Sequence, residues 1–152
     1  MGLVYADVEV RREGGPVCRV RFLVDSGAPL SVLPWPVWHA LGLKALRTMD
    51  FVLADGTTMR RRISDCRFRF RGADAPSPVV LGQRRDTALL GTLTLEALGL
   101  ILNPFERTLK PMRMMLAALR ERHDAGSTVP PSSRSTRSMY GGNATSDCPP
   151  ST

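Results

Sequence analysis

The sequence predicts a mainly β, closed barrel-like domain with two short helices and an added C-terminal helix. Runs of four to eight residues rich in β-branched and aromatic side chains recur through residues 1–111, separated by Gly, Pro and Asp turn signals. Two short stretches in this region have helical spacing, and each is followed by a Gly. After them, apolar residues spaced three and four apart indicate one more amphipathic helix.

The first elements are a hairpin and a short helix. Residues 3–12 and 17–24 are β-rich runs on either side of a Gly-Gly-Pro turn, which is typical of two paired strands. Pro34 and Pro36 then favour the start of a short helix that ends at Gly42. Its apolar face consists of Val37, Trp38 and Leu41.

The middle of the chain predicts further strands. Residues 49–63 form a strand, a turn at Asp55-Gly56 and a second strand, because Asp-Gly is a strong hairpin signal. Residues 66–71 alternate Cys-Arg-Phe-Arg-Phe-Arg, which indicates a separate strand with one apolar and one cationic face. Short strands at 79–82 and 88–90 follow.

The last part of the domain combines a helix with a strand pair. Thr92 is expected to cap a helix over residues 93–98, and Gly99 ends it. Residues 100–103 and 108–110 form the final strands. We therefore expect one domain over residues 1–111, an amphipathic helix over 112–123, and a disordered tail over 124–152, which is rich in Ser, Thr, Pro and Gly.

The charge of the chain is +7, and all of it lies before the tail, which holds two Arg and two Asp. A basic chain can bind acidic surfaces, but net charge alone does not specify a fold or a nucleic-acid site. We therefore do not expect nucleic acid as a partner. The arginines at 60–62, 67, 69 and 71 lie mostly on the polar side of strands, so they indicate either a solvated face or selection of acidic substrates or partners.

Other sequence features exclude several classes of protein. The three cysteines are odd in number and include no CxxC pair, so neither a disulfide framework nor a zinc site is indicated. We expect no metal and no cofactor. The N-terminus does not have a basic start followed by a long apolar run, and no stretch is long enough to cross a membrane. We expect a cytoplasmic protein without a membrane partner.

One stretch cannot be explained by folding alone. In "RFLVDSGAPLSVLP", residues 21–34, an apolar strand runs directly into Asp25, Ser26 and Gly27. A carboxylate at the end of a core strand is costly to desolvate. The bare tripeptide suits a turn in which Asp and Ser bond local backbone groups. It also suits a carboxylate that a strand delivers rigidly to a site.

Three motifs, taken in order, resemble the retropepsin-like single-lobe aspartic proteases of bacterial type. "LVDSGA" resembles their catalytic strand and loop, and "LADGTT" lies where they carry a flap hairpin. "ALLGTLTLEALGLIL" is similar to their later apolar-apolar-Gly element and the helix after it. The resemblance extends from about residue 3 to residue 111 and implies the acid protease fold, a closed β-barrel.

The resemblance implies a hydrolase that cleaves peptide bonds with two aspartates and a water molecule. This chain contains a single Asp-Ser-Gly, so the second aspartate must come from a second copy in a homodimer. Asp25 is then catalytic, and Ser26, Gly27 and Ala28 support its loop. Ser26 would hydrogen-bond across the dimer, and the Gly27 carbonyl would hold the substrate backbone.

The other two motifs imply binding and structural roles. The flap residues that would close over a peptide or protein substrate are Leu53, Ala54, Asp55, Gly56 and Thr57. The residues of the structural second loop are Leu89, Leu90 and Gly91.

The chain departs from the retroviral relatives at two positions. Pro29 replaces an acid and Thr92 replaces an Arg, so the charge network that supports their dimer is not available here. An alternative function therefore stays open. The same fold could serve as a non-catalytic dimerisation or peptide-binding module, with Asp25 kept for its loop geometry.

Overall fold

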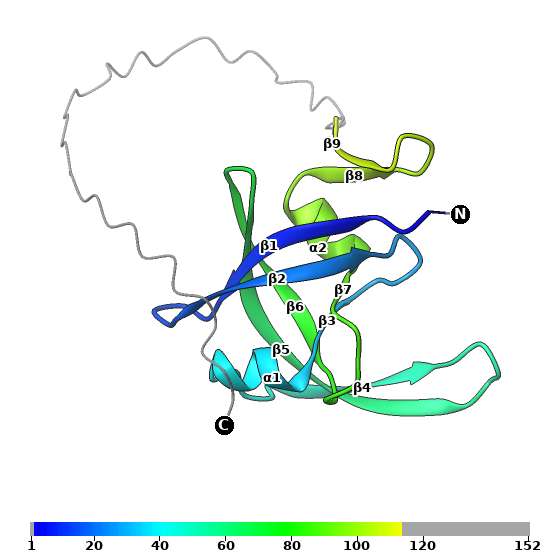
Figure 1. Ribbon diagram of the computed structural model, residues 1–152. Coiled ribbons are helices and arrows are strands. Elements are labelled where there is room, and N and C mark those ends of the chain that lie inside the picture. Colours follow the sequence, from blue (N-terminus) through cyan, green and yellow to red (C-terminus); the bar gives the residue numbers. More distant parts are fainter. Residues whose placement is uncertain (1, 114–152) are drawn as a thin grey trace, which may run out of the picture. The chain divides into compact units, whose positions relative to one another are not determined.

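The structure is a computed structural model that describes residues 2–113, and in this range it contains nine strands and two short helices (Figure 1). The strands are β1 (Tyr5–Arg11), β2 (Val17–Val24), β3 (Ser31–Leu33), β4 (Arg47–Val52), β5 (Thr58–Phe70), β6 (Ala73–Leu81), β7 (Leu89–Leu90), β8 (Leu100–Asn103) and β9 (Thr108–Pro111). The helices are α1 (Trp35–Ala40) and α2 (Thr92–Ala97).

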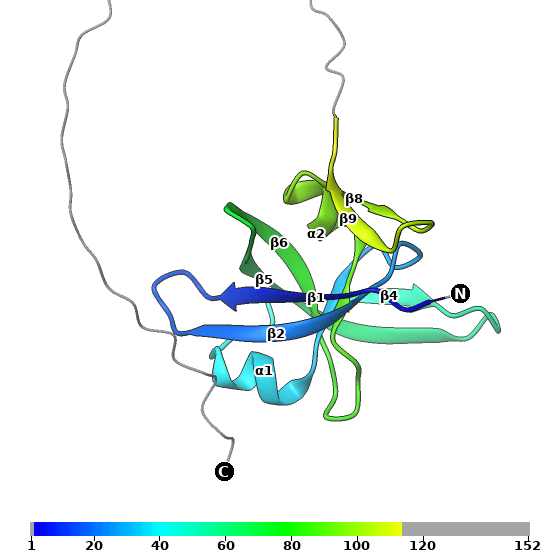
Figure 2. The same cartoon turned by 45° about the horizontal axis from the view of Figure 1, so that its top comes forward.

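Seven of the strands in this range form a sheet that closes on itself. Its order is β1-β2-β7-β3-β6-β5-β4, and β1 also pairs with β5, where Val10 lies opposite Phe68. Closure gives β1 a partner on both sides and so removes an open edge. The expected mainly β barrel is confirmed, and Figure 2 shows β8 and β9 beside α2 at one end of it.

Alternating side chains fill the barrel. In the β1–β2 hairpin, Val8 and Phe22 are fully buried, whereas Asp7 and Arg21 face outward. The Phe22 ring lies 5.9 Å from the ring of Phe68 on β5. Full burial of such a side chain stabilises the fold by roughly 1.5–3 kcal/mol. The period-two pattern therefore gives both the hairpin and the core, as the sequence predicts.

Two strands are longer than their sequence pattern indicates. β5 is a single strand of 13 residues, not two strands ending near 63 and starting at 66. β6 starts at Ala73 instead of Val79, although it contains Pro76 and Pro78. Residues two apart direct their N–H groups to the same side of a strand. Within β6, only Val79–Leu81 pair with β3, so the missing donors of both prolines can lie along the unpaired part of this edge.

The start of α2 differs from the sequence prediction, whereas that of α1 does not. α2 has Gly91, not Thr92, at its N-cap position, and no side chain caps it. α1 follows Pro34 and the chain turns after it at Gly42, as expected. The Gly91 N–H is instead bound from outside the helix, which matters for the site below.

The C-terminal predictions lie almost entirely outside the described residues. Met112 and Arg113 belong to no helix or strand, and the rest of the expected helix over 112–123 and the tail over 124–152 are not described. Between residues 2 and 113, neither helix has the length and apolar character needed to cross a membrane.

Candidate active site

Asp25 lies directly after β2, at the point where this strand pairs in parallel with β7. Leu23 and Val24 lie opposite Leu89 and Leu90, and the Asp25 N–H donates to the Leu90 carbonyl at 3.1 Å. Asp25 is half-buried. The sheet therefore fixes the backbone of this residue while its carboxylate keeps access to solvent.

The turn after Asp25 holds one oxygen of its carboxylate. The Gly27 N–H donates to Asp25 Oδ1 at 2.9 Å, and the Ala28 N–H donates to the Asp25 carbonyl at 3.3 Å. A Cβ at position 27 would lie 3.2 Å from Oδ1, so glycine allows this close approach. Within residues 2–113, no group hydrogen-bonds Oδ2, and Ser26 is exposed. The second oxygen is free to bind a water molecule or substrate.

The β7–α2 connection locks this loop from the other side. The Thr92 N–H donates to the Ala28 carbonyl at 2.9 Å, and the Leu93 N–H donates to the Pro29 carbonyl at 3.1 Å. Gly91 packs so closely that a Cβ there would lie 2.5 Å from the carbonyl carbon of Leu30. The Asp25 loop and the β7–α2 connection, which are predicted from separate motifs, are therefore joined by hydrogen bonds and close packing.

Three buried hydroxyl groups support that unit. Ser31 Oγ accepts a hydrogen bond from the Gly91 N–H at 2.9 Å and lies 2.6 Å from Thr94 Oγ1. Thr94 Oγ1 also lies 2.9 Å from Ser77 Oγ. All three side chains are buried, so each hydroxyl must find its partner inside the protein. They join β3, β6 and α2 directly beneath the Asp25 loop.

The β4–β5 hairpin carries the predicted flap residues at its tip. The Leu53 N–H donates to the Thr57 carbonyl at 2.8 Å, and the Gly56 N–H donates to the Leu53 carbonyl at 2.9 Å. Asp55 Oδ1 accepts from the Thr57 hydroxyl at 2.6 Å and from the Thr57 N–H at 2.9 Å, and these bonds lower the pKa of Asp55. Asp55 is therefore the turn former that its position predicts.

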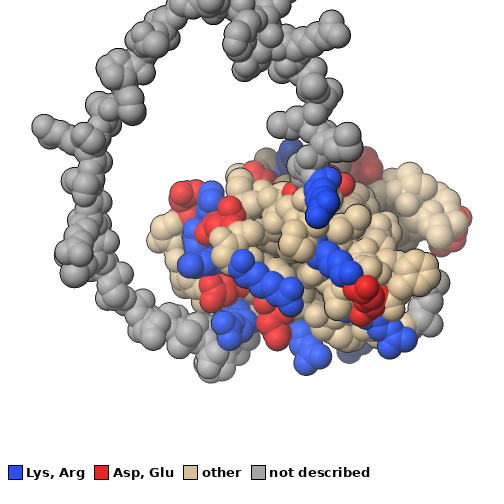
Figure 3. Space-filling model, turned by 90° about the horizontal axis from the view of Figure 1, so that it is seen from above, with Lys and Arg blue, Asp and Glu red and all other residues tan. Residues whose placement is uncertain are grey.

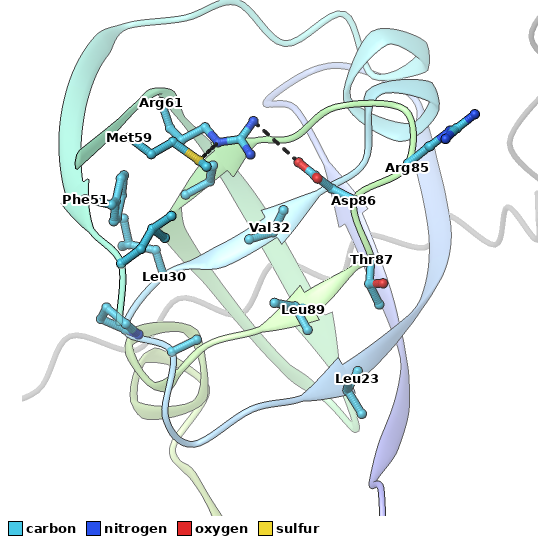
Figure 4. A pocket seen from close by; sticks show the side chains of 14 residues that line it. Leu23, Leu30, Val32, Phe51, Met59, Arg61, Arg85, Asp86, Thr87 and Leu89 are labelled. Carbon is cyan, nitrogen blue, oxygen red and sulfur yellow. Dashed lines mark hydrogen bonds and ion pairs between the residues drawn. The ribbon is translucent and has the colours of Figure 1, made fainter. Parts of the chain in front are cut away.

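A cavity of about 600 Å³ lies between this hairpin and the Asp25 loop (Figure 4). Its walls are mostly apolar and come from both regions. The lining residues are Leu23, Ala28, Pro29, Leu30, Val32, Phe51, Leu53, Met59, Arg61, Val80, Arg85, Asp86, Thr87 and Leu89. Ala28, Leu53 and Leu89, predicted from three separate motifs, thus meet at one cavity. The other predicted site residues lie outside its lining: Asp25, Ser26, Gly27, residues 54–57, Leu90 and Gly91.

One polar pair stands in the cavity wall. Arg61 Nη1 lies 3.6 Å from Asp86 Oδ2, and the same oxygen accepts from the Gln83 N–H at 2.7 Å. Figure 4 shows the pair beside Met59, while Arg85 points away from the cavity. The sequence places Asp86 beside Arg84 and Arg85, but its partner is Arg61, from a different strand. The sheet register decides this pairing, so neighbours in sequence could not reveal it.

Comparison with known proteins identifies the family. A family model described as aspartyl protease matches residues 7–94, more than half of the chain. This chain belongs to the aspartyl protease family. The match includes the Asp25 loop, the flap hairpin and the connection at Gly91. No curated protein sequence matches this aspartyl protease.

Solved structures support the fold of this aspartyl protease. The protease of EIAV in complex with the inhibitor HBY-793 superposes with a TM-score of 0.50 at 15% identity, covering 76% of this chain and 94% of that one. The retroviral protease-like domain of Ddi1 from Leishmania major gives 0.50 at 14% identity, covering 75% and 91%. The fold is therefore retropepsin-like.

The buried hydroxyls are the part of the aspartyl protease site that sequence reasoning missed. Ser31 and Ser77 lie outside the three motifs, and Thr94 lies inside the third motif without an assigned role. The one signal they give is a polar side chain within an apolar run, such as Thr94 in "LLGTLTLEAL". Residues 2–113 contain no His, Cys, Asp and Glu cluster that could hold a metal ion.

Proposed function

We propose that this aspartyl protease is an endopeptidase that acts as a homodimer, with one Asp25 from each subunit in a shared site. The observation that carries the proposal is the Asp25 loop itself. Asp25 is a half-buried carboxylate, with one oxygen held by Gly27 and the other without a hydrogen-bond partner among residues 2–113. The chain contains no second Asp-Ser-Gly. A two-fold axis next to this loop would bring two such carboxylates together.

The two carboxylates would divide the chemistry between them. Like charges a few ångström apart do not both ionise easily, so the pair holds one proton, as is general for aspartic proteases. The ionised carboxylate takes a proton from the attacking water, and the protonated one donates to the carbonyl oxygen of the peptide bond. The two pKa values belong to the pair, not to either residue.

The side of the domain that carries the Asp25 loop suits a second copy. Figures 1 and 2 both place the flap tip, this loop, the N-terminus and the β8–β9 turn on the right, and the right end of the face in Figure 3 is mostly uncharged. Exposed apolar side chains occur in these segments, including Leu3, Leu53 and Phe105. We infer that apolar contacts hold the dimer in place of the missing charge network.

The cavity provides the side-chain pocket of the proposed peptidase. An extended peptide between the flap and the Asp25 loop would pair its backbone with the protein backbone and place one side chain in the cavity. Walls such as Leu30, Val32 and Phe51 favour an apolar side chain there. The Gly27 carbonyl, from the residue two after Asp25, would accept a hydrogen bond from the substrate backbone.

The test compares wild type with Asp25→Asn on a mixed peptide library from acid to neutral pH, with products read by mass spectrometry. Asp65→Asn is the matched control, because Asp65 is an exposed acid on β5 away from the loop. Asp25→Asn should abolish cleavage, by at least about a thousandfold, and should leave the native mass of a dimer unchanged. Asp65→Asn should cleave normally.

Two outcomes would contradict the proposal. Cleavage by purified Asp25→Asn at the wild-type rate would exclude this carboxylate as the catalytic group. A dimeric wild type that binds peptides and cleaves none would favour the non-catalytic binding module instead.

A further inference from the structure

A second hollow, of about 290 Å³, lies beside the substrate cavity and is built mainly from arginine side chains. We call it the arginine pocket; its lining residues are Trp35, Arg60, Arg61, Arg62, Leu81, Gly82, Gln83 and Arg84. Arg61 lines both hollows, so the two share a wall. Three separate regions meet here: β5, the start of α1 and the segment after β6.

Two of the four arginines already have acidic partners. Arg60 donates two hydrogen bonds to the Asp50 carboxylate, at 2.7 and 3.1 Å, and Arg61 lies 3.6 Å from Asp86. Neither Arg62 nor Arg84 pairs with a carboxylate in the described range of the chain. The pocket therefore has two positive charges that no acid of residues 2–113 neutralises.

Arg62 and Arg84 are instead held by aromatic rings. The guanidinium carbon of Arg84 lies 4.0 Å from the ring centre of Trp35, and that of Arg62 lies 5.3 Å from the ring centre of Trp38. A guanidinium that lies over a ring uses its face for that contact, and its N–H donors point outward in the guanidinium plane. Both groups can therefore still bind an anion.

The wall of the pocket is fixed by hydrogen bonds. The Trp38 indole N–H donates to the Gly82 carbonyl at 2.8 Å, and the Trp35 N–H donates to the Gln83 carbonyl at 3.2 Å. The Gln83 N–H in turn donates to Asp86. These bonds tie α1 to the segment that carries Arg84, so little ordering is needed when a ligand binds.

We propose that the arginine pocket binds an acidic side chain of the peptide substrate, a few residues along the peptide from the apolar side chain in the cavity. This inference rests on the proposed function and gives its substrate class: peptides with an acid flanking an apolar residue. The shared wall at Arg61 makes one extended chain able to reach both hollows. A volume of about 290 Å³ accommodates a Glu or Asp side chain.

The described structure favours a peptide over a nucleic acid as the ligand. A backbone of phosphates needs a continuous basic track. Here the unpaired arginines lie beside Arg60 and Arg61, which Asp50 and Asp86 already pair. A short ligand with one or two carboxylates fits this local charge better.

The first experiment measures kcat/KM for pairs of peptides that differ only by Glu or Gln at positions flanking the cleaved bond. Wild type should prefer the Glu peptide by about tenfold at one position, the scale of a charge-assisted hydrogen bond. Arg62→Gln/Arg84→Gln should cleave both peptides alike, at the rate of the wild type on the Gln peptide. Arg19→Gln/Arg69→Gln removes the same charge far from the pocket and should keep the preference.

A binding measurement separates this inference from the proposed function. Binding of the Glu peptide to the Asp25→Asn protein is measured by tryptophan fluorescence, because Trp35 lies in the pocket wall. Binding that falls about tenfold in Arg62→Gln/Arg84→Gln, and falls in high salt, supports the pocket even if wild type cleaves nothing. Equal binding of Glu and Gln peptides, or tighter binding of a single-stranded oligonucleotide through the same arginines, would overturn it.

Discussion

The loop that carries Asp25 and the hairpin that covers the cavity are held in opposite ways. Backbone groups of β7 and α2 bind the loop at several points, and buried hydroxyls lie beneath it. The hairpin tip is held by bonds within its own turn, between Leu53, Asp55, Gly56 and Thr57, and all of these residues are exposed. The Asp25 carboxylate is therefore placed rigidly, while the hairpin tip can move independently.

The largest effect should come from adding one methyl group between the two loops. In Gly91→Ala the new Cβ would lie 2.5 Å from the Leu30 carbonyl carbon and 2.9 Å from the Ala28 carbonyl oxygen, both backbone atoms that cannot turn aside. We expect a loss of about 3 kcal/mol in the free energy of unfolding. Denaturant unfolding followed by circular dichroism measures it.

Gly56→Ala is the matched control in the hairpin. A Cβ there meets nothing within 4 Å, but its φ of +83° is unfavourable for alanine. The expected loss is about 1 kcal/mol. An equal loss in the two variants would contradict the difference in rigidity between the loop and the hairpin.

The features of the loop and the hairpin that the sequence predicts are those formed by neighbouring residues. The Asp-Ser-Gly turn and the Asp-Gly hairpin each depend on three or four adjacent residues, and both form as expected. The role of the β7–α2 connection at Gly91 is predicted only by the resemblance of its motif to a family. Periodicity alone indicates a short strand ending in a helix, and says nothing of its partner.

The parts that escaped prediction depend on pairing between distant strands. Ser31 and Thr94 are 63 residues apart, and no pattern in either segment points to the other. The Arg61–Asp86 pair arises in the same way, from packing between β5 and the segment after β6. The first half of β6 was not predicted as a strand, because Pro76 and Pro78 usually indicate an interruption of a strand. Long-range register therefore decides both the support of the site and its charge.

A smaller effect should come from removing the central hydroxyl under the loop. Thr94→Val keeps the shape of the side chain and leaves the hydroxyls of Ser31 and Ser77 each short of one partner in a buried space. The expected loss is about 2 kcal/mol in the free energy of unfolding. Faster exchange of the Gly91 amide hydrogen should accompany it, because this amide donates to Ser31.

Thr92→Val makes the same chemical change two residues earlier. The Thr92 side chain is half-buried and has no hydrogen-bond partner among the described residues, so we expect a change within about 0.5 kcal/mol. If Thr94→Val proved as mild as this control, the hydroxyls would not be what holds the loop.

The smallest change in global stability should follow from replacing Asp55, the acid of the hairpin turn. The effect of this replacement should be confined to the turn. Asp55→Ala removes the acceptor of the Thr57 hydroxyl and N–H. Global stability should stay nearly constant because the residue is exposed. Hydrogen exchange at the Thr57 amide should accelerate, while exchange at the Gly27 amide stays unchanged. Asp65→Ala, also exposed on β5, is the control for loss of a carboxylate.

The same turn should respond to pH in one direction. The hydrogen bonds from Thr57 lower the pKa of Asp55 below its usual 3.8, so the folded turn favours the charged carboxylate. Its contribution is therefore complete above the usual pKa and is lost as pH falls through the lower folded value. Protection of the Thr57 amide, corrected for the intrinsic exchange rate, should stay constant from pH 7 to 5 and fall at more acid pH. Protection that fell equally in Asp55→Ala would show that another group controls the hairpin.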